Sequence, residues 1–274
     1  MAQRSALRLL AAMSMKDMLR NRLTGLAPMF LFAWLVLIYG VLSFMLSEAA
    51  SDPATHPLRA ALPSILVTGI AGIAFMVTTV PLVSMRERGL LRLFGTTPLR
   101  RPIFLLAQLP SRLALIALEV GFIVTLVVVA GFVGDHNNYW RLLGTLIIGT
   151  AMLFACAMLL ASRSSNTEST HQSMTILVMG VFVFSGTFLP PGTLPAFTEI
   201  FTNAIPTTWF AAAISADLTG AAPFLPVLAL WVMMLAVTVI AGVLAVRRFE
   251  WDHEEAVTHT PPRGQKSAMK EMVS

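Results

Sequence analysis

The chain has 274 residues, of which 56% are hydrophobic and only 12% are charged, about half the charged fraction of an average soluble domain. The mean hydropathy of +0.76 argues against a soluble globular domain and indicates an integral membrane protein. The single cysteine, Cys156, excludes an intrachain disulfide. The net charge of +5 would also fit a nucleic-acid-binding protein, so the positions of the basic residues must decide between these classes.

Six apolar stretches predict six transmembrane helices. A spanning helix needs about 20 mostly apolar residues, and it must be helical because lipid offers the backbone no hydrogen-bond partners. The stretches are residues 26–46, 62–84, 103–133, 142–161, 174–189 and 227–246. The sequence therefore predicts an all-α membrane protein whose six-span domain covers residues 26–248.

Two of these stretches depart from a regular span. Residues 103–133 contain Pro110 and Arg112, so we expect an interfacial helix, a break near Pro110 and a span from about Leu113. Residues 174–189 would form only about 24 Å of helix at 1.5 Å per residue. This fifth helix is therefore expected to begin earlier, in the polar sequence SSNTESTHQ.

The segments outside the spans have their own patterns. Residues 1–25 are free of prolines and glycines up to position 22 and predict a cytoplasmic interfacial helix. Residues 190–220 are apolar but broken by prolines, so we expect re-entrant extracellular helices with Trp209 and Phe210 at the membrane interface; a loop lying on the surface is the alternative. The polar residues 249–274 predict a disordered cytoplasmic tail.

The distribution of basic residues predicts the orientation. If the N-terminus is cytoplasmic, 17 of the 19 lysines and arginines lie on the cytoplasmic side, and only Arg59 and Arg141 lie outside. This asymmetry indicates a multi-pass plasma-membrane protein with both termini in the cytoplasm. It also removes the nucleic-acid hypothesis, because the basic residues sit where they orient the spans. The acids predicted to be external are Glu48, Asp52, Asp135, Glu199 and Asp217.

Catalytic and nucleotide-binding motifs are absent from the sequence. It contains no G-x-x-x-x-G-K-[ST] phosphate loop, no H-E-x-x-H metal motif and no G-x-S-x-G nucleophile elbow. We therefore expect no enzyme activity, no metal site and no ATP binding by this chain. Glu119, inside the third span, is expected to be either a polar point on a substrate path or a protonated or hydrogen-bonded residue at a helix–helix contact.

The loop between the second and third spans, residues 85–102, contains five arginines in the sequence RERGLLRLFGTTPLRR. It resembles the E-x-G-T-L-E-R-L-L-x-T-P-L-x-R pattern of permease subunits of ABC-2 type exporters. The matching residues are Glu87, Gly89, Leu91, Leu93, Thr97, Pro98, Leu99 and Arg101. Two residues depart from the pattern: Leu90 replaces the usual Thr, and Arg92 replaces an acid. The sequence FSGTFLPPGTLPAF, residues 184–197, is similar to the family's segment at the outer end of span five.

The resemblance implies a mechanism and a set of functional residues. Two permeases, identical or sister chains, would pair, and each would dock on a separate ATPase subunit that binds ATP and Mg. The loop would form the coupling helix that rests on the ATPase, whereas the simpler alternative is that its arginines only hold it in the cytoplasm. The implied coupling residues are Arg86, Glu87, Gly89, Leu91, Arg92, Phe94, Thr97, Pro98 and Arg101. The candidate substrate-path residues are Glu119, Phe184, Phe188, Phe197 and Phe201.

The substrate expected from the sequence is hydrophobic or amphipathic, such as a drug, an antibiotic or a lipid. The chain has 17 Phe but only 2 Tyr and 5 Trp, whereas sugar-binding tunnels favour Trp and Tyr. The multidrug and antibiotic exporter branch is therefore favoured. A polysaccharide or glycolipid exporter, and a non-transporting immunity or sensor protein with the same fold, are the alternatives.

Overall fold

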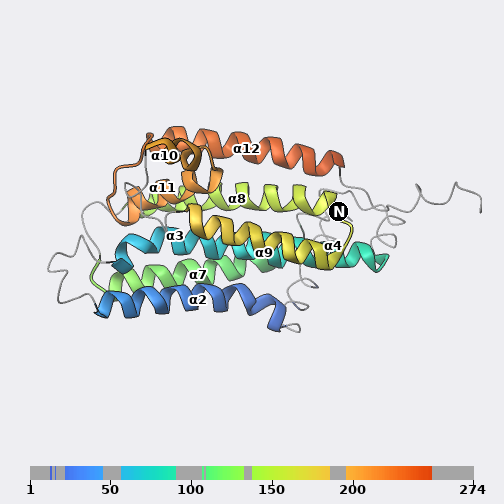
Figure 1. The fold of residues 1–274 in the computed structure, drawn as a ribbon, viewed down its shortest axis with the longest axis horizontal. Coiled ribbons are helices and arrows are strands. Elements are labelled where there is room, and N and C mark those ends of the chain that lie inside the picture. Colours follow the sequence, from blue (N-terminus) through green and yellow to red (C-terminus); the bar gives the residue numbers. More distant parts are fainter. Residues whose placement is uncertain are drawn as a thin grey trace, which may run out of the picture.

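The computed structural model describes residues 22–45, 57–90, 109–132, 138–185 and 196–248, together with positions 13, 16 and 107. All regular elements in these ranges are helices, which confirms the all-helical prediction for the described part of the chain. The long helices lie side by side as an elongated bundle, and successive ones run in opposite directions (Figure 1).

The elements follow the predicted stretches closely. They are α2 (Arg22–Met45), α3 (Pro57–Gly72), η2 (Ile73–Thr79), α4 (Val80–Glu87), α7 (Leu109–Val129), α8 (Tyr139–Arg163), α9 (Thr167–Phe184), α10 (Ala196–Asn203), α11 (Pro206–Leu218) and α12 (Val227–Arg248). Among the described residues, four helical segments are long and apolar enough to cross a membrane: Pro57–Glu87, Leu109–Val129, Tyr139–Arg163 and Val227–Arg248. A shorter apolar helix covers Met29–Met45. The six-span layout remains a prediction.

The helix starts have local causes. Asn166 precedes α9, and its side chain accepts a hydrogen bond from the Ser169 backbone N–H at 2.9 Å, so the polar stretch starts this helix as expected. Pro110 is helical and lies within α7. The described helix of the third span therefore already includes Leu109 and Pro110, ahead of the start expected near Leu113.

The segment Pro57–Glu87, which comprises α3, η2 and α4, is the most buried part of the bundle and contains an irregular stretch. In the most apolar 18-residue stretch of Pro57–Glu87, 89% of the residues are buried in the protein, whereas in that of α12 only 17% are buried. α12 therefore lies at the periphery of the bundle. Between α3 and α4, the seven residues of η2 form a π-helix, a wider turn that is rare and often functional. The Arg112 Nη2 donates to the Val77 carbonyl at 3.2 Å, and the Thr79 hydroxyl donates to the Ala157 carbonyl at 3.2 Å. Side chains thus tie the π-segment to α7 and α8.

Small residues on α8 let other helices approach closely. A Cβ at Gly149 would lie 2.2 Å from the Phe210 ring, and one at Gly144 would lie 2.9 Å from the Trp231 ring. The Trp231 indole N–H also donates to the Thr145 hydroxyl at 2.9 Å. Phe210 and Trp209 of α11 are buried in the protein, because α8 leaves a space at Gly149 that accepts the Phe210 ring. Their expected position at the membrane interface remains a prediction.

Several expectations fall on residues that the structure does not describe. Apart from Met13 and Lys16, which are helical, the predicted interfacial helix up to residue 21 lies outside the described residues. So does the tail after residue 248. The domain boundaries at residues 25 and 248 therefore remain predictions, although α2 already begins at Arg22.

We predict that Gly149→Ala destabilises the protein by about 1–3 kcal/mol, the usual cost of overpacking a core, because the Phe210 ring must move. Thermal unfolding of the purified protein in detergent measures this effect. The matched control is Gly180→Ala, since nothing lies within 4 Å of a Cβ at that position. An equal response of both variants would contradict the close contact between α8 and α11.

Candidate functional site

Arg86, near the end of α4, caps the C-terminus of α8. Its side chain is buried, and its Nη1 donates to the carbonyl oxygens of Ala161 at 3.1 Å and Ser164 at 2.8 Å. The last carbonyls of a helix have no partners within the helix and carry the negative end of its dipole. A guanidinium is therefore well suited to this position.

Glu87, the next residue, caps the N-terminus of α9. Its Oε2 accepts hydrogen bonds from the Thr167 backbone N–H at 3.2 Å and from the Thr167 hydroxyl. A carboxylate complements the positive end of a helix dipole. The clamp, formed by Arg86 and Glu87 with the turn from Ser164 to Thr167, thus places each charge at the helix end that favours it.

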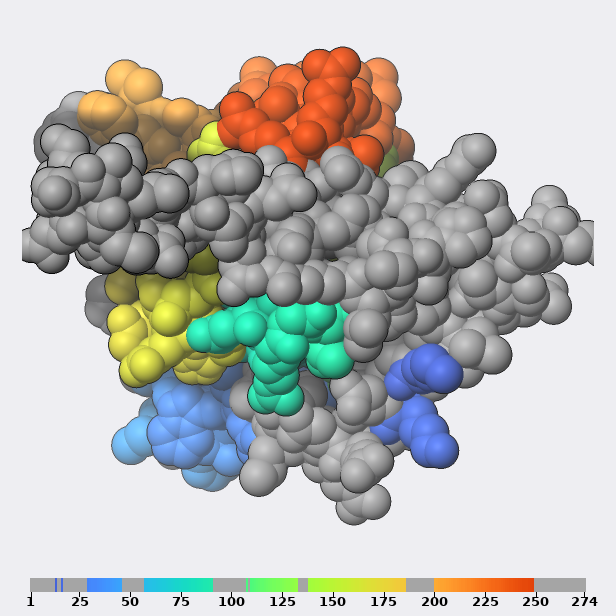
Figure 2. Space-filling model, turned by 90° about the vertical axis from the view of Figure 1, so that its right-hand side faces the viewer, coloured from blue at the N-terminus to red at the C-terminus, as the bar shows by residue number. Residues whose placement is uncertain are grey.

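Gly89 explains why the chain can leave α4 immediately after the clamp. Its φ of +70° lies in the left-handed region, which favours glycine at the end of a helix. The Gly89 N–H donates to the Arg86 carbonyl at 2.9 Å, and the Arg88 N–H donates to the Ser84 carbonyl at 3.1 Å. Figure 2 looks onto this end of the bundle, where the end of α4 (teal) lies beside the start of α9 (yellow).

The predicted coupling residues are only partly described. The structure places Arg86, Glu87 and Gly89, whereas the remaining ones lie outside the described residues: Leu91, Arg92, Phe94, Thr97, Pro98 and Arg101. The clamp itself was not predicted from the sequence. The sequence features that correspond to the clamp are the oppositely charged pair Arg86 and Glu87 just before Gly89, and the polar turn that follows 80 residues later.

A shallow hollow of about 550 Å³ lies beside the clamp. Six of its seven lining residues are polar or charged: it is lined by Val80, Glu87, Asn166, Thr167, Glu168, His171 and Gln172. Within the described ranges, no group of three or more His, Cys, Asp or Glu residues is placed to hold a metal ion. The chemistry that this end of the bundle offers is hydrogen bonding and charge.

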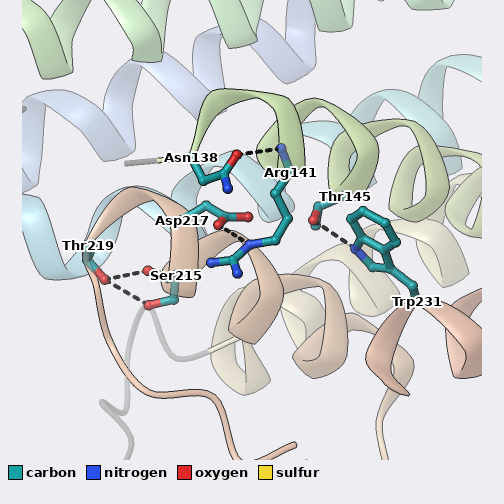
Figure 3. A network of polar contacts seen from close by, with 7 residues as sticks. All are labelled: Asn138, Arg141, Thr145, Ser215, Asp217, Thr219 and Trp231. Atoms are coloured by element: carbon teal, nitrogen blue, oxygen red, sulfur yellow. Dashed lines mark hydrogen bonds and ion pairs between the residues drawn. The ribbon is translucent and has the colours of Figure 1, made fainter. Parts of the chain in front are cut away.

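At the opposite end, two arginines converge on the last turn of α11. The Arg141 Nε lies 2.5 Å from the Asp217 Oδ1, with the Asp217 side chain 0% exposed and that of Arg141 42% exposed (Figure 3). The Arg59 Nη2 donates to the Thr219 carbonyl at 3.4 Å. We call these two contacts the α11 latch. Arg59 and Arg141 are the two basic residues predicted to be external, and Asp217 is a buried ion-pair partner rather than a surface acid.

The candidate substrate-path aromatics are only partly described. Phe184, at the end of α9, and Phe201, in α10, have exposed side chains, and both helix ends lie at the α11 end of the bundle (Figure 1). The Thr208 hydroxyl donates to the Phe184 carbonyl at 3.3 Å, which joins α9 to α11. Phe188 and the Phe197 side chain lie outside the described residues, so the path remains a prediction.

Glu119 is fully buried at the contact between α7 and α3. A Cβ at Gly69 would lie 2.9 Å from both Glu119 carboxyl oxygens and 2.8 Å from Phe32 Cδ2. Neither oxygen accepts a hydrogen bond from a described residue, and a charge at the bilayer centre costs about 2.5–3.5 kcal/mol on insertion scales. The carboxyl therefore occupies a notch that only glycine leaves open.

The family model of the ABC-2 type transporter matches residues 5–219. The matched region includes the clamp, Glu119 and the α11 latch, and it ends before α12. No curated protein matches the chain.

We predict that Arg141→Gln destabilises the protein by about 2 kcal/mol at neutral pH, between the values for exposed and buried ion pairs. Burial raises the pKa of Asp217, and the hydrogen bond and charge of Arg141 lower it. Without Arg141 only burial acts, so the Asp217 pKa rises further and the folded state favours the protonated acid. A raised pKa of Asp217 in the folded state stabilises the fold at pH values below the pKa of Asp217 in the unfolded chain. This stabilisation is lost as pH rises through the folded-state pKa.

The defect of Arg141→Gln should therefore shrink as pH falls toward the ordinary Asp value of 3.8. Thermal unfolding from acidic to neutral pH measures it. The control Arg248→Gln removes an exposed arginine from the end of α12. A defect of Arg141→Gln that is independent of pH, or that persists unchanged when Asp217→Asn is added, would rule out the ion pair as its cause.

Proposed function

The chain belongs to the ABC-2 type transporter family, and from this premise we propose that it is the permease subunit of an ATP-driven exporter. Members of the family are membrane components of ABC transporters, are normally non-catalytic and generally work with an ABC ATPase subunit. We propose that this chain pairs with a second permease in the plasma membrane. The partner ATPases bind ATP and Mg, and the pair exports a hydrophobic or amphipathic substrate such as a drug, an antibiotic or a lipid.

The clamp is the observation that supports this proposal best. Segment 85–102 begins in the last turn of α4, where Arg86 and Glu87 bind the ends of α8 and α9. A force applied to the loop by an ATPase therefore acts on three helices at once. Arginines that served only to hold the loop in the cytoplasm would need no such contacts.

The π-segment above α4 supports the same mechanism. η2 separates α4 from α3, and π-helical turns are wider and less regular than α-helical ones. Side chains from neighbouring helices bind this segment, as the contact between Arg112 and Val77 shows. We propose that α4 changes its angle to α3 at η2 when the loop moves, and that the α11 latch holds the opposite, exit end.

We predict that Phe94→Ala weakens association with the partner ATPase by about 30-fold or more. Truncating an interface anchor commonly costs about 2 kcal/mol or more, and each 1.4 kcal/mol is a factor of ten. Copurification and titration of the ATPase against permease in nanodiscs measure this. The control Phe201→Ala removes an exposed Phe at the α11 end, and equal affinity of both variants would contradict docking through the loop.

We predict that Glu87→Ala leaves ATPase association intact but lowers the ATP hydrolysis of the complex by about threefold or more, because loss of a helix cap costs about 0.5–2 kcal/mol. Hydrolysis rates of the reconstituted complex measure this. Glu168→Ala is the matched control, since Glu168 is an acid in the first turn of the same helix. Equal rates in both variants would leave the clamp without a part in coupling.

We predict that both termini are cytoplasmic. In a Cys156→Ala background, single cysteines at Asp52 and Asp135 should react from outside with a membrane-impermeant thiol reagent, because the distribution of Lys and Arg places both outside. A cysteine at Ser267 should react only after permeabilisation, which also serves as the control for its reactivity. Labelling at Ser267 in intact cells would overturn the orientation.

A further inference from the structure

The Glu119 carboxyl has an almost entirely apolar setting. It lies on the α3-facing side of α7, against Gly69 and beneath Phe32, and its own helix buries Leu115, Ile116 and Ile123 nearby. Neither oxygen has a donor among the described residues. Such acids in a membrane are costly and are normally matched by a positive partner, a proton or a functional ligand.

Arg112, the basic residue nearest in sequence on α7, does not supply that partner. Its Nη1 donates to the Ser111 hydroxyl at 2.7 Å, and its Nη2 donates to the Val77 carbonyl at 3.2 Å. Seven residues separate it from Glu119, which is about 10 Å along a helix. Arg112 therefore binds the π-segment and does not neutralise Glu119.

Phe32, which lies beside the Glu119 carboxyl at Gly69, forms an aromatic pair with Phe122 of α7. The rings of Phe32 and Phe122 meet in a T-shaped arrangement, with centroids 5.9 Å apart and planes at 76°. Phe32 belongs to α2 and is buried, whereas Phe122 follows Glu119 by three residues on α7 and is 48% exposed. The pair therefore closes the seam between α2 and α7, and one of its rings faces outward.

We propose that Glu119, Phe32 and Phe122 form a binding site for a lipophilic organic cation, which enters from the bilayer through the seam between α2 and α7. A carboxylate supplies the counter-charge that a cation needs in an apolar setting, and aromatic faces attract cations within about 6 Å of the ring centroid. The proposal rests on the proposed function and names its substrate class: amphipathic cations rather than neutral lipids or sugars.

The site is closed in this structure, since Phe32 and the carboxyl together fill the space beside Gly69. Opening it requires the Phe122 ring to turn away from Phe32. Exposed side chains change rotamer within nanoseconds, so an exposed Phe122 is a suitable gate.

Equilibrium binding of radiolabelled tetraphenylphosphonium to the full-length protein in nanodiscs tests the site. Tetraphenylborate, an anion of the same size and shape, is the matched probe. We expect Glu119→Gln to weaken tetraphenylphosphonium binding by at least tenfold without changing that of tetraphenylborate. Phe122→Ala should weaken it severalfold, whereas Phe30→Ala, which removes an exposed ring elsewhere on α2, should not. Unchanged binding in Glu119→Gln, or no preference of the wild type for the cation, overturns the proposal.

A second measurement needs no substitution and so does not depend on the folding of a variant. Dicyclohexylcarbodiimide modifies carboxylic acids in apolar surroundings, and peptide mass spectrometry identifies the modified residue. We expect Glu119 to be modified in the wild type and to be protected by tetraphenylphosphonium but not by tetraphenylborate. Modification that the cation leaves unchanged overturns the site. Association of Glu119→Gln with the ATPase should equal that of the wild type, so a failure of this proposal is distinguishable from a failure of the proposed permease function.

Discussion

Backbone groups in an apolar surrounding must find their hydrogen-bond partners within the protein, and this constraint explains the placement of most buried charges here. Arg86 binds the last carbonyls of α8, Arg112 binds a carbonyl of the π-segment, and Arg59 binds the carbonyl that follows α11. Each of these positions interrupts the regular helical ladder. These buried and half-buried arginines thus stabilise irregular backbone, which is where a membrane protein can bend without leaving polar groups unpaired.

Glu119 does not follow this pattern. It lies in the middle of a regular helix and, among the described residues, has neither a backbone nor a side-chain donor. The two carboxylates of the clamp and the α11 latch, by contrast, have partners from distant helices. An acid with a structural role usually has a hydrogen-bond or ion-pair partner within the protein, as Glu87 and Asp217 do. Glu119 differs from both, which agrees with the proposal that its partner is a bound cation.

The sequence predicted the helices better than the contacts between them. Long apolar runs located α7 and α12 to within a few residues, and the polar stretch before residue 174 correctly predicted the early start of α9. The clamp joins residues 75–80 positions apart, and the two contacts of the α11 latch join residues 76 and 160 positions apart. No periodicity of the sequence reports such pairs. The resemblance to the family singled out Glu87 and Gly89, but their roles as a helix cap and a left-handed turn became visible only in three dimensions. The burial of Phe210 could not be predicted, because the space at Gly149 that accepts its ring belongs to another helix.

The position of α8 has a mechanical consequence. Arg86 binds the C-terminus of α8. At the N-terminus of α8, Asn138 caps the first turn, and Arg141 in that turn binds Asp217 of α11. This 25-residue rod is about 37 Å long at 1.5 Å per residue, and packed protein interiors are only slightly compressible. A displacement along its axis at one end therefore reappears at the other almost undiminished. A movement at the clamp can therefore displace the α11 latch, and the reverse, through the single rigid helix α8, without rearrangement of the side chains between them.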